Sequence, residues 1–369
     1  MAREGRLRGA LVGYGFIGAL GHVPAYLARR DVELVAVADT TPARLALVRE
    51  RLPHARVYPS AEALLAAEAG HLDFLDVATP PCDHAELAHR ALDAGLHVLC
   101  EKPLAVRHAQ AAAMLEHARR ARRVIFPCHN YRHAPVVKAI REVIDSGRIG
   151  AVRAVTLETF RNTHARGVPE FDTHWRRKVR TSGGGIAMDH GSHTFYLTFD
   201  WLDAWPVSVT AKMVNQEPSR WDTEDNFSAV LTFPGAVLAH VHLTWTAGVR
   251  KVVYTVQGER GAVTVDDDDL QIATQRATGG PDVAQGAVTW DVERRKVRSD
   301  WMDASHAGWF NAMFDRFLGA VRRGEWAGKD AQDAERCIEI IEASYRSAAD
   351  GCREVALGDA ALEPTAAAG

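Results

Sequence analysis

Short apolar runs alternate with longer, alanine-rich amphipathic stretches over the first 130 residues, and this alternation constrains the fold more than any other feature of the chain. Runs this continuously apolar are typical of strands that are covered on both faces. Strands alternating with helices of this length form a parallel sheet through right-handed crossovers. The predicted strands are Leu7–Val12, Glu33–Ala38, Ala55–Tyr58, Phe74–Ala78, His97–Cys100 and Val124–Cys128. The predicted helices are Ile17–Arg29, Pro42–Arg51, Ala61–Glu68, Cys82–Ala94 and Val106–Ala121.

The pattern changes after about residue 150, where most predicted strands follow one another directly and turn signals separate them. These strands are Ala151–Phe160, Val207–Val214, Asn226–Phe233, Val237–Thr246, Lys251–Gln257, Ala262–Asp266 and Leu270–Thr274. Two helices, His306–Arg323 and Ala331–Ala349, follow. We therefore predict an α/β protein with a parallel-sheet domain at 1–128 and a second α/β domain at 129–358, built on a large, mostly antiparallel, open sheet. The last helix, 331–349, is a candidate to pack back on the first domain, and residues 359–369 are expected to form a frayed tail.

Composition excludes several classes of function. Lys and Arg number 44 against 47 Asp and Glu, so the net charge of −3 leaves no basic excess for binding nucleic acid. No run approaches the ~20 apolar residues of a membrane span, and we identify no signal peptide. The five cysteines are odd in number and show no CxxC spacing, which suits a reducing cytosol. We expect a cytoplasmic protein without nucleic-acid or membrane partners.

A glycine-rich turn, Gly13-Tyr14-Gly15-Phe16-Ile17-Gly18, joins the first predicted strand to the first predicted helix. In this context the first glycine permits a tight turn, the second lets a pyrophosphate approach the backbone, and the third lets helix and strand pack closely. The alternative is a purely structural turn. We predict a Rossmann domain whose cofactor contacts include the glycines together with Phe16 and Ile17.

Asp39 follows the second predicted strand, 21 residues after Gly18, where an acid can bind the hydroxyls of the adenosine ribose. A 2′-phosphate at that position would face its carboxylate, which is an unfavourable contact between like charges. The nearest cation is Arg44, in the next helix. The sequence therefore predicts NAD rather than NADP as the cofactor.

Four further motifs make the family recognisable: Thr79-Pro80-Pro81-Cys82-Asp83-His84, Glu101-Lys102-Pro103, Asn130-Tyr131-Arg132 and the run from Gly183 to His193 with its D-x-G-x-H pattern. With the glycine-rich turn, they resemble the Gfo/Idh/MocA oxidoreductases over about residues 7 to 358. The resemblance implies a substrate held between the two domains, over the nicotinamide. It also implies a cis Lys–Pro bond and a homo-oligomer, a dimer or tetramer, formed through the open sheet face.

Lys102 follows a parallel strand at its carboxyl end, where ligands bind in such sheets. A lysine there can take or relay a hydroxyl proton; the alternative is a surface lysine in a Lys-Pro turn. Asp189 and His193 are four residues apart and share one face of a helix that starts near Gly185. Their alternative is a capping acid and a buried structural histidine. We predict Lys102, Asp189 and His193 as the catalytic residues, and expect His190 to point elsewhere.

The resemblance carries over further contacts. Expected cofactor contacts, besides those above, are Thr79, Pro80, His84, Glu101, Lys102, Asn130, Trp175 and Arg176. Expected substrate contacts are Lys102, Tyr131, Arg132, Asp189, His193 and Tyr196. Tyr196 departs from the family pattern, which commonly has an acid three residues after this histidine.

The segment 161–180 is long and polar and lacks apolar periodicity, as functional loops often do. Its aromatic residues, Phe171 and Trp175, are expected to seek burial. We predict that His164 and His174 contact the substrate and select it without taking part in the chemistry. The alternative is a surface loop that only covers the site.

Metal sites are not predicted. His240 and His242 alternate on one strand but lack a third ligand at suitable spacing. The acidic run Asp266–Asp269 fits a solvated turn better than a calcium site.

The predicted function is hydride transfer between a secondary alcohol of a sugar, cyclitol or related polyol derivative and NAD. An alternative retains the reduced cofactor and uses transient oxidation to permit epimerisation, elimination or glycoside cleavage. A third reading, a cofactor-binding regulator, does not need the three residues predicted to be catalytic.

Overall fold

Six parallel strands form the first sheet of the computed structural model, which describes residues 6–276, 289–299 and 306–358. The strands are β1 (Leu7–Val12), β2 (Val32–Ala38), β3 (Arg56–Tyr58), β4 (Phe74–Val77), β5 (His97–Cys100) and β6 (Ile125–Pro127). Their order, β3-β2-β1-β4-β5-β6, is that of a Rossmann fold, with the ligand-binding edge at the carboxyl ends of the strands. The predicted parallel sheet is therefore confirmed. The predicted tail, 359–369, lies outside the described residues.

Helices flank this sheet where the sequence predicts them, with one difference at the start. They are α1 (Val23–Leu27), α2 (Pro42–Arg51), α3 (Ala61–Glu68), α4 (His84–Asp93) and α5 (His108–Ala121). The first predicted helix begins instead with a π-helical turn, Gly18–His22, which wraps one more residue into the turn than an α-helix does. As a result His22 points into the protein and is fully buried.

Nine strands form the second sheet, in the order β14-β13-β12-β11-β7-β10-β9-β8-β15. They are β7 (Val152–Phe160), β8 (Ser208–Val214), β9 (Asn226–Phe233), β10 (Val237–Thr244), β11 (Lys251–Gly258), β12 (Gly261–Asp266), β13 (Asp269–Gln275), β14 (Trp290–Lys296) and β15 (Val355–Ala356). Only the β7–β10 pair among them is parallel, which confirms the mostly antiparallel sheet. The sequence does not predict β14 and β15, because β14 is exposed along its length and β15 has two residues.

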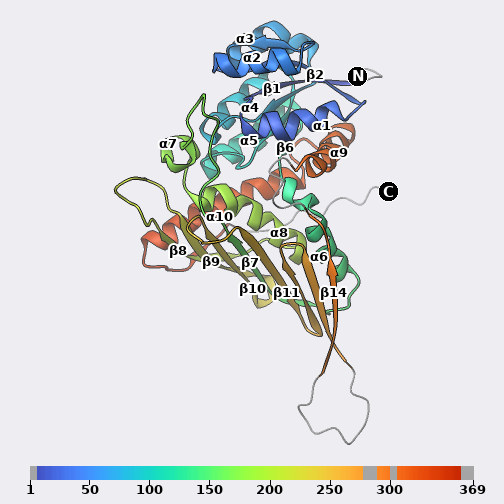
Figure 1. The fold of residues 1–369 in the computed structure, drawn as a ribbon, viewed down its shortest axis with the longest axis vertical. Helices are drawn as coiled ribbons and strands as arrows, with labels where there is room; N and C mark the ends of the chain where they lie inside the picture. Colours follow the sequence, from blue (N-terminus) through green and yellow to red (C-terminus); the bar gives the residue numbers. More distant parts are fainter. Residues whose placement is uncertain (1–5, 277–288, 300–305, 359–369) are drawn as a thin grey trace, which may run out of the picture.

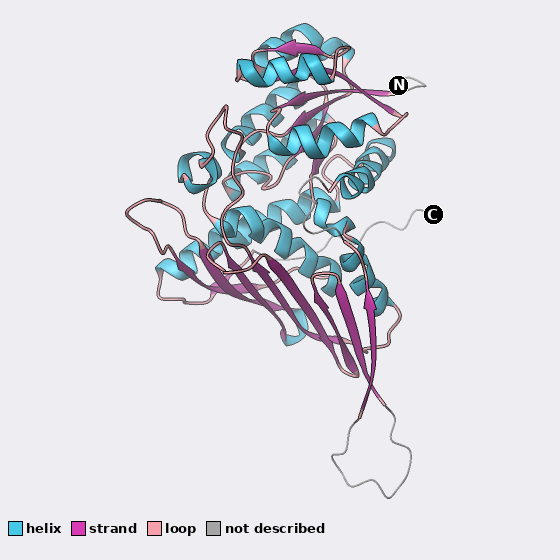
Figure 2. Ribbon diagram, in the orientation of Figure 1, coloured by secondary structure: helices cyan, strands magenta, loops and turns pink. Residues whose placement is uncertain are grey.

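The remaining helices are α6 (Pro135–Asp145), α7 (Val179–Ser182), α8 (Ser192–Leu202), α9 (Ala307–Arg323) and α10 (Lys329–Ala349). Helices α8 and α10 lie between the two sheets, on one face of the second, whereas α9 packs beside α1 on the first sheet (Figures 1 and 2). Five 3₁₀ turns, Ala69–His71, Pro81–Asp83, Asn130–His133, Trp175–Arg177 and Pro234–Ala236, and a second π turn, Ala187–Gly191, complete the described helical elements. None of these helices is long and apolar enough to cross a bilayer.

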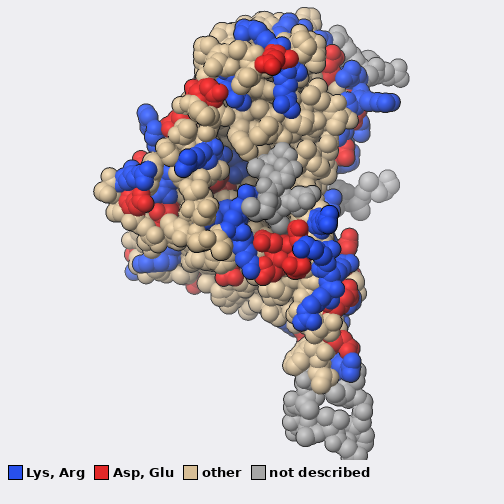
Figure 3. Space-filling view, in the orientation of Figure 1, with Lys and Arg blue, Asp and Glu red and all other residues tan. Residues whose placement is uncertain are grey.

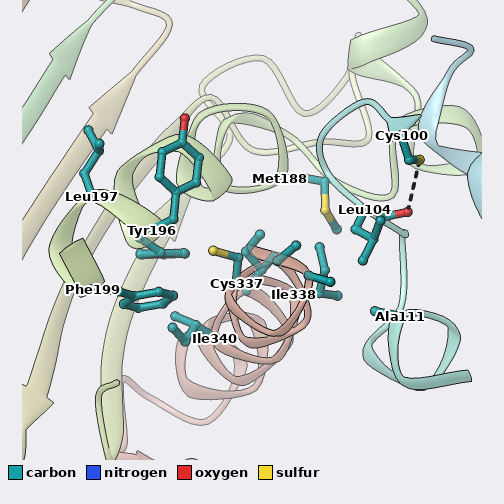
Figure 4. Packing of buried hydrophobic residues seen from close by; sticks show 14 of the residues in the cluster. Cys100, Leu104, Ala111, Met188, Tyr196, Leu197, Phe199, Cys337, Ile338 and Ile340 are labelled. Atoms are coloured by element: carbon teal, nitrogen blue, oxygen red, sulfur yellow. Dashed lines mark hydrogen bonds between the residues drawn. The ribbon is translucent and has the colours of Figure 1, made fainter. Parts of the chain in front are cut away.

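Helix α10 is the central packing element between the sheets. Cys337, Ile338 and Ile340 of this helix pack against α8 and against the segment after β5 (Figure 4). It also contacts α5 and β6 of the first sheet, as the sequence suggested for the last helix. On the surface drawn in Figure 3, basic and acidic side chains are interspersed, as expected for a small net charge.

Candidate active site

The glycine-rich turn has the geometry that its sequence predicts. Gly13 adopts φ +96°, and a Cβ atom there would lie 2.6 Å from the carbonyl oxygen of Ala78. A Cβ atom on Gly18 would lie 2.4 Å from the oxygen of Gly13, so both positions exclude any side chain. Gly15 is different, because its Cβ would meet open space. The turn thus packs closely at two glycines and stays open at the one where a pyrophosphate is expected to approach.

Asp39 lies directly beside this turn. One carboxylate oxygen accepts the Tyr14 N–H and the other accepts the Thr41 N–H, both at 2.8 Å. Arg44 donates from Nε to the carbonyl oxygen of Tyr14 at 2.7 Å, and its guanidinium lies over the Tyr14 ring. The acid is therefore held rigidly at the end of β2, where it can meet a ribose.

The segment after β4 completes the edge of the predicted cofactor site. Thr79 lies against Gly13, and its hydroxyl oxygen is buried without a partner among the described residues. Such an orphaned group fits a contact with a bound cofactor. The ring of His84 instead bridges the carbonyl oxygens of Thr79 and Pro103, at 2.9 and 2.8 Å. His84 therefore ties two loops together and has no ring nitrogen left for a direct cofactor contact.

Glu101 faces the interior. Its carboxylate accepts hydrogen bonds from the ring of His22 at 2.9 Å and from the N–H of Lys102 at 3.0 Å. His22 also donates to Asp76 at 2.6 Å, and Tyr26 donates to the same Asp76 oxygen. Burial alone lowers the pKa of His22, but the two carboxylates outweigh it and raise the pKa to about 10. Glu101 thus anchors the backbone of Lys102 rather than facing the cofactor.

His22, Asp76 and Cys128 lie close enough together to hold a metal ion. Both ring nitrogens of His22 are already bonded to carboxylates. Burial and the nearby acids raise the pKa of Cys128 well above its usual range, which disfavours the thiolate that binds metals. The cluster is better explained as a buried ion-pair network, and the absence of a metal remains a prediction.

Lys102 meets Asp189 in the space between the two sheets. The ammonium donates to Oδ1 of Asp189 at 2.9 Å and to its backbone oxygen at 3.0 Å, and both side chains are largely buried. Arg176 lies 3.5 Å from the same carboxylate oxygen. Burial alone raises the pKa of Asp189, but Lys102, Arg176 and His190 outweigh it and hold the pKa well below its usual range. The Lys102–Pro103 bond is cis, as the resemblance implies.

The second π turn, Ala187–Gly191, carries Asp189 and His190 into the start of α8. The wider turn places the His190 ring 3.8 Å from the other oxygen of Asp189 and 6.2 Å from the His193 ring, between centroids. The expectation that His190 points elsewhere is therefore wrong, because it assumed α-helical spacing. Burial lowers the pKa of His190 to about 3. Asp189 acts in the opposite direction, but Arg161, Lys102 and Arg176 also lower the pKa.

His193 is enclosed by two tyrosines. Its Nδ1 lies 2.9 Å from the hydroxyl of Tyr196, and the Tyr131 ring stacks on the imidazole with centroids 3.9 Å apart. Burial, reinforced by Lys102 and His190, holds the pKa of His193 well below its usual range. His193 is therefore neutral around pH 7. Tyr196 occupies the position of the missing acid and bonds the histidine as a neutral partner.

Two other predicted residues lie away from this cluster. Arg132 is buried in contact with three carboxylates, those of Asp200, Asp330 and Asp333. Its guanidinium joins α8 to α10, so the structure gives it a scaffold position rather than one facing a substrate. Asn130 is buried in the turn after β6.

The predicted substrate segment, 161–180, forms a loop over residues 161–178 that extends from β7 towards the first sheet, and its last two residues begin α7 (Figure 1). His164 and His174 are joined by a ring-to-ring hydrogen bond of 2.9 Å, and the Trp221 ring packs against both. Glu170 reaches across to Arg44, at 3.8 Å. Trp175 is half-buried under the Arg176 guanidinium, whereas Phe171 is exposed, contrary to its expected burial.

Sequence reasoning did not find Glu224, which shapes the approach to Asp189. Its carboxylate accepts the N–H groups of Gly185 and Ala187 at 3.0 and 2.9 Å, and the hydroxyl of Tyr345 at 2.8 Å. A Cβ atom on Gly185 would collide with the Glu224 backbone. The glycine run therefore permits close approach to Glu224 and Tyr345. No local motif surrounds Glu224, so the sequence offers no signal for it.

Comparison with known proteins agrees with this geometry. Residues 7–129 match the oxidoreductase family with an NAD-binding Rossmann fold, and residues 137–264 match the GFO/IDH/MocA C-terminal domain. D-glucoside 3-dehydrogenase of Escherichia coli is 32% identical over 259 residues, which cover 66% of this chain and 72% of the relative. Inositol 2-dehydrogenase of Rhizobium meliloti is 27% identical over 93% of this chain and 97% of its own length.

A solved structure of GenD2 from gentamicin A biosynthesis, in complex with NAD, superposes with a TM-score of 0.79. It is 26% identical, and the match covers 97% of this chain and 98% of GenD2. The family matches to both halves of the chain thus agree with the family that the order of its motifs indicates. This protein belongs to the GFO/IDH/MocA family of oxidoreductases, with an NAD-binding Rossmann fold in its N-terminal part.

Proposed function

We propose that the protein is an NAD-dependent dehydrogenase that oxidises a secondary hydroxyl of a sugar, cyclitol or related polyol derivative, or reduces the corresponding ketone. The observation that carries this proposal is the contact of Lys102 with Asp189 near His193, at the carboxyl end of β5 and so at the same edge of the first sheet as the glycine-rich turn. A glucoside and an inositol are named as substrates of two relatives. Both are polyhydroxylated compounds, whose hydroxyl groups can form hydrogen bonds with the polar side chains of this site.

In this proposal NAD, when bound, supplies the hydride acceptor. The open face at Gly15 and the hydroxyl of Thr79 would hold it, with Asp39 at the ribose. Lys102 receives the hydroxyl proton, and Asp189 fixes the position of the Lys102 nitrogen. His193 lies beside this pair and offers its remaining ring nitrogen to a substrate oxygen. The side chains of Lys102 and Asp189 are largely buried, which limits the access of water to the reacting groups.

The redox-recycling alternative has one observation in its favour. The loop 161–178 reaches the first domain through Glu170 and Arg44, close to Asp39. A loop closed over this region would slow the exchange of the cofactor. Turnover without added NAD, by protein purified with its cofactor, would support recycling.

The decisive experiment is a panel of sugars and polyols assayed with NAD, following the absorbance of the reduced nicotinamide. Formation of reduced cofactor in proportion to product supports the dehydrogenase. Conversion of substrate without net reduction supports recycling instead. Binding of both ligands without any chemistry would point to a regulator and contradict the proposal.

We further propose domain limits of 1–128 and 129–358, a cytoplasmic location and a homo-oligomer. All five cysteines are free, which supports a reducing compartment. One face of the second sheet carries a row of residues without Asp, Glu, Lys or Arg, running through Thr156, His240, Val230 and Thr210. Such a face suits contact with a second copy of the chain.

A further inference from the structure

Tyr196 lies fully buried on α8, with its hydroxyl directed away from α10 (Figure 4). The hydroxyl oxygen has two neighbours. It accepts the backbone N–H of Tyr131 at 3.2 Å, and it lies 2.9 Å from Nδ1 of His193. Burial raises the pKa of Tyr196 well above its usual range, so the phenol keeps its proton.

The phenol proton needs an acceptor, because leaving a buried donor unpaired costs about 1–3 kcal/mol. A backbone N–H can only donate, so Tyr131 cannot accept this proton. Among the described residues, Nδ1 of His193 is the remaining partner of the hydroxyl. The O–H of Tyr196 therefore donates to Nδ1, which must be unprotonated.

A neutral imidazole carries one proton, and with Nδ1 unprotonated that proton is on Nε2. Nε2 of His193 has no hydrogen-bond partner among the described residues and is not fully buried. It therefore faces accessible space beside Lys102 and Asp189 as an N–H donor.

We propose that Tyr196 is a positioning residue that fixes His193 in the Nε2–H form, so that His193 donates a hydrogen bond to the substrate oxygen and Lys102 is the base. This inference about the chemistry rests on the proposed function. The base is the Lys102 amine after it has released the ammonium proton that it holds in its contact with Asp189. In the proton step, the substrate O–H bond breaks, the oxygen keeps the electron pair, and the proton forms a bond to the nitrogen of Lys102. His193 neither gains nor loses a proton.

The tautomer is tested directly by ¹⁵N NMR of protein labelled at histidine, with His193→Gln to identify the signals of His193. At neutral pH, wild-type protein should show a protonated Nε2 and an unprotonated Nδ1. Tyr196→Asp should reverse this pattern, because a carboxylate only accepts hydrogen bonds and so requires Nδ1–H. A protonated Nδ1 in the wild type overturns the proposal. No substrate is needed, so this result stands apart from any failure to find an activity.

A matched pair of variants tests the role. The amide of His193→Gln retains an N–H donor near the position of Nε2, whereas His193→Leu retains none. His193→Gln should keep kcat/KM within about tenfold, while His193→Leu should lose about 10²–10³, the usual effect of removing a positioned donor. Equal and large losses in both variants would show that His193 takes the proton. The affinity for NAD serves as the folding control for both.

Discussion

At the scale of single residues, the position of the Lys102 nitrogen is fixed by the two hydrogen bonds that it donates to Asp189. Lys102→Ala should lower kcat by about 10²–10⁴, the usual contribution of a positioned acid–base group, and leave the affinity for NAD nearly unchanged. Steady-state kinetics and a cofactor titration measure the two effects.

Lys102→Arg is the matched control, because it preserves the positive charge but cannot act as a base. It should be almost as inactive as Lys102→Ala. An active Lys102→Arg enzyme would mean that charge alone is required.

Asp39 carries the prediction about cofactor choice. Asp39→Asn removes the charge and keeps the size, so the affinity for NAD should fall by about 1–3 kcal/mol as a charged hydrogen bond is lost. Discrimination against NADP should relax at the same time. Titration of both cofactors measures the ratio, and an unchanged ratio would place the acid away from the ribose.

Sequence reasoning succeeds at residues whose chemistry depends on the local backbone. Gly13, Gly18 and Asp39 lie where their spacing predicts, because each acts on the turn next to it. It fails for Arg132 and Glu101, whose partners come from distant segments. A buried ion pair leaves no periodic trace in the sequence of either partner.

At the scale of elements, the two π turns determine which histidines enter the interior. The first π turn contains His22, and the second contains His190. An apolar period of 3.6 residues predicts a helix at both places but assigns the wrong faces, because a π turn adds a residue without changing the composition. The positions of these side chains therefore could not be predicted from periodicity.

The first π turn also makes stability depend on pH. The pKa of His22 rises from 6.5 to about 10 on folding, so the folded state holds its proton more tightly. This stabilisation is complete below pH 6.5 and is lost as the pH rises through about 10. His22→Gln removes it at every pH. The free energy of unfolding of wild type relative to this variant should therefore fall by about 5 kcal/mol between these limits, at about 1.4 kcal/mol for each pKa unit.

Urea unfolding of both proteins at several pH values measures this difference. A difference that stays constant with pH would show that His22 is neutral in the folded protein.

The loop 161–178 carries the prediction about specificity. His164→Ala or His174→Ala breaks the bond between the two rings. Each should raise KM or reorder preference over a sugar panel, with little change in NAD affinity. Arg166→Ala, an exposed change in the same loop, is the control and should behave as the wild type. If both histidine variants keep the wild-type KM and substrate preference, the loop only covers the site and does not select the substrate.

At the scale of the whole molecule, the open face of the second sheet predicts association. Val230 lies in the middle of its uncharged row, between His240 and Thr210. Val230→Lys should shift the protein towards monomers, because an unpaired charge would be buried in the contact. Light scattering measures the mass, with Leu47→Lys on the first domain as the control. A wild-type monomer at micromolar concentration would contradict the prediction.

Most of the architecture was predictable, since alternating strands and helices admit few topologies. The sequence does not predict β14, because only Trp290 and Val292 of its seven residues are apolar and all seven are exposed, so only pairing with β13 defines it.

The contact between Glu170 and Arg44 has a consequence for protein engineering. A designer who wants this scaffold to accept NADP would replace Asp39 and turn the neighbouring Arg44 towards the 2′-phosphate. Arg44, however, also contacts Glu170 in the loop that carries His164 and His174. Moving the Arg44 guanidinium to the phosphate would therefore remove this contact with the loop. Cofactor choice and substrate choice are not separate modules in this scaffold, and a library aimed at either one needs to be screened for both.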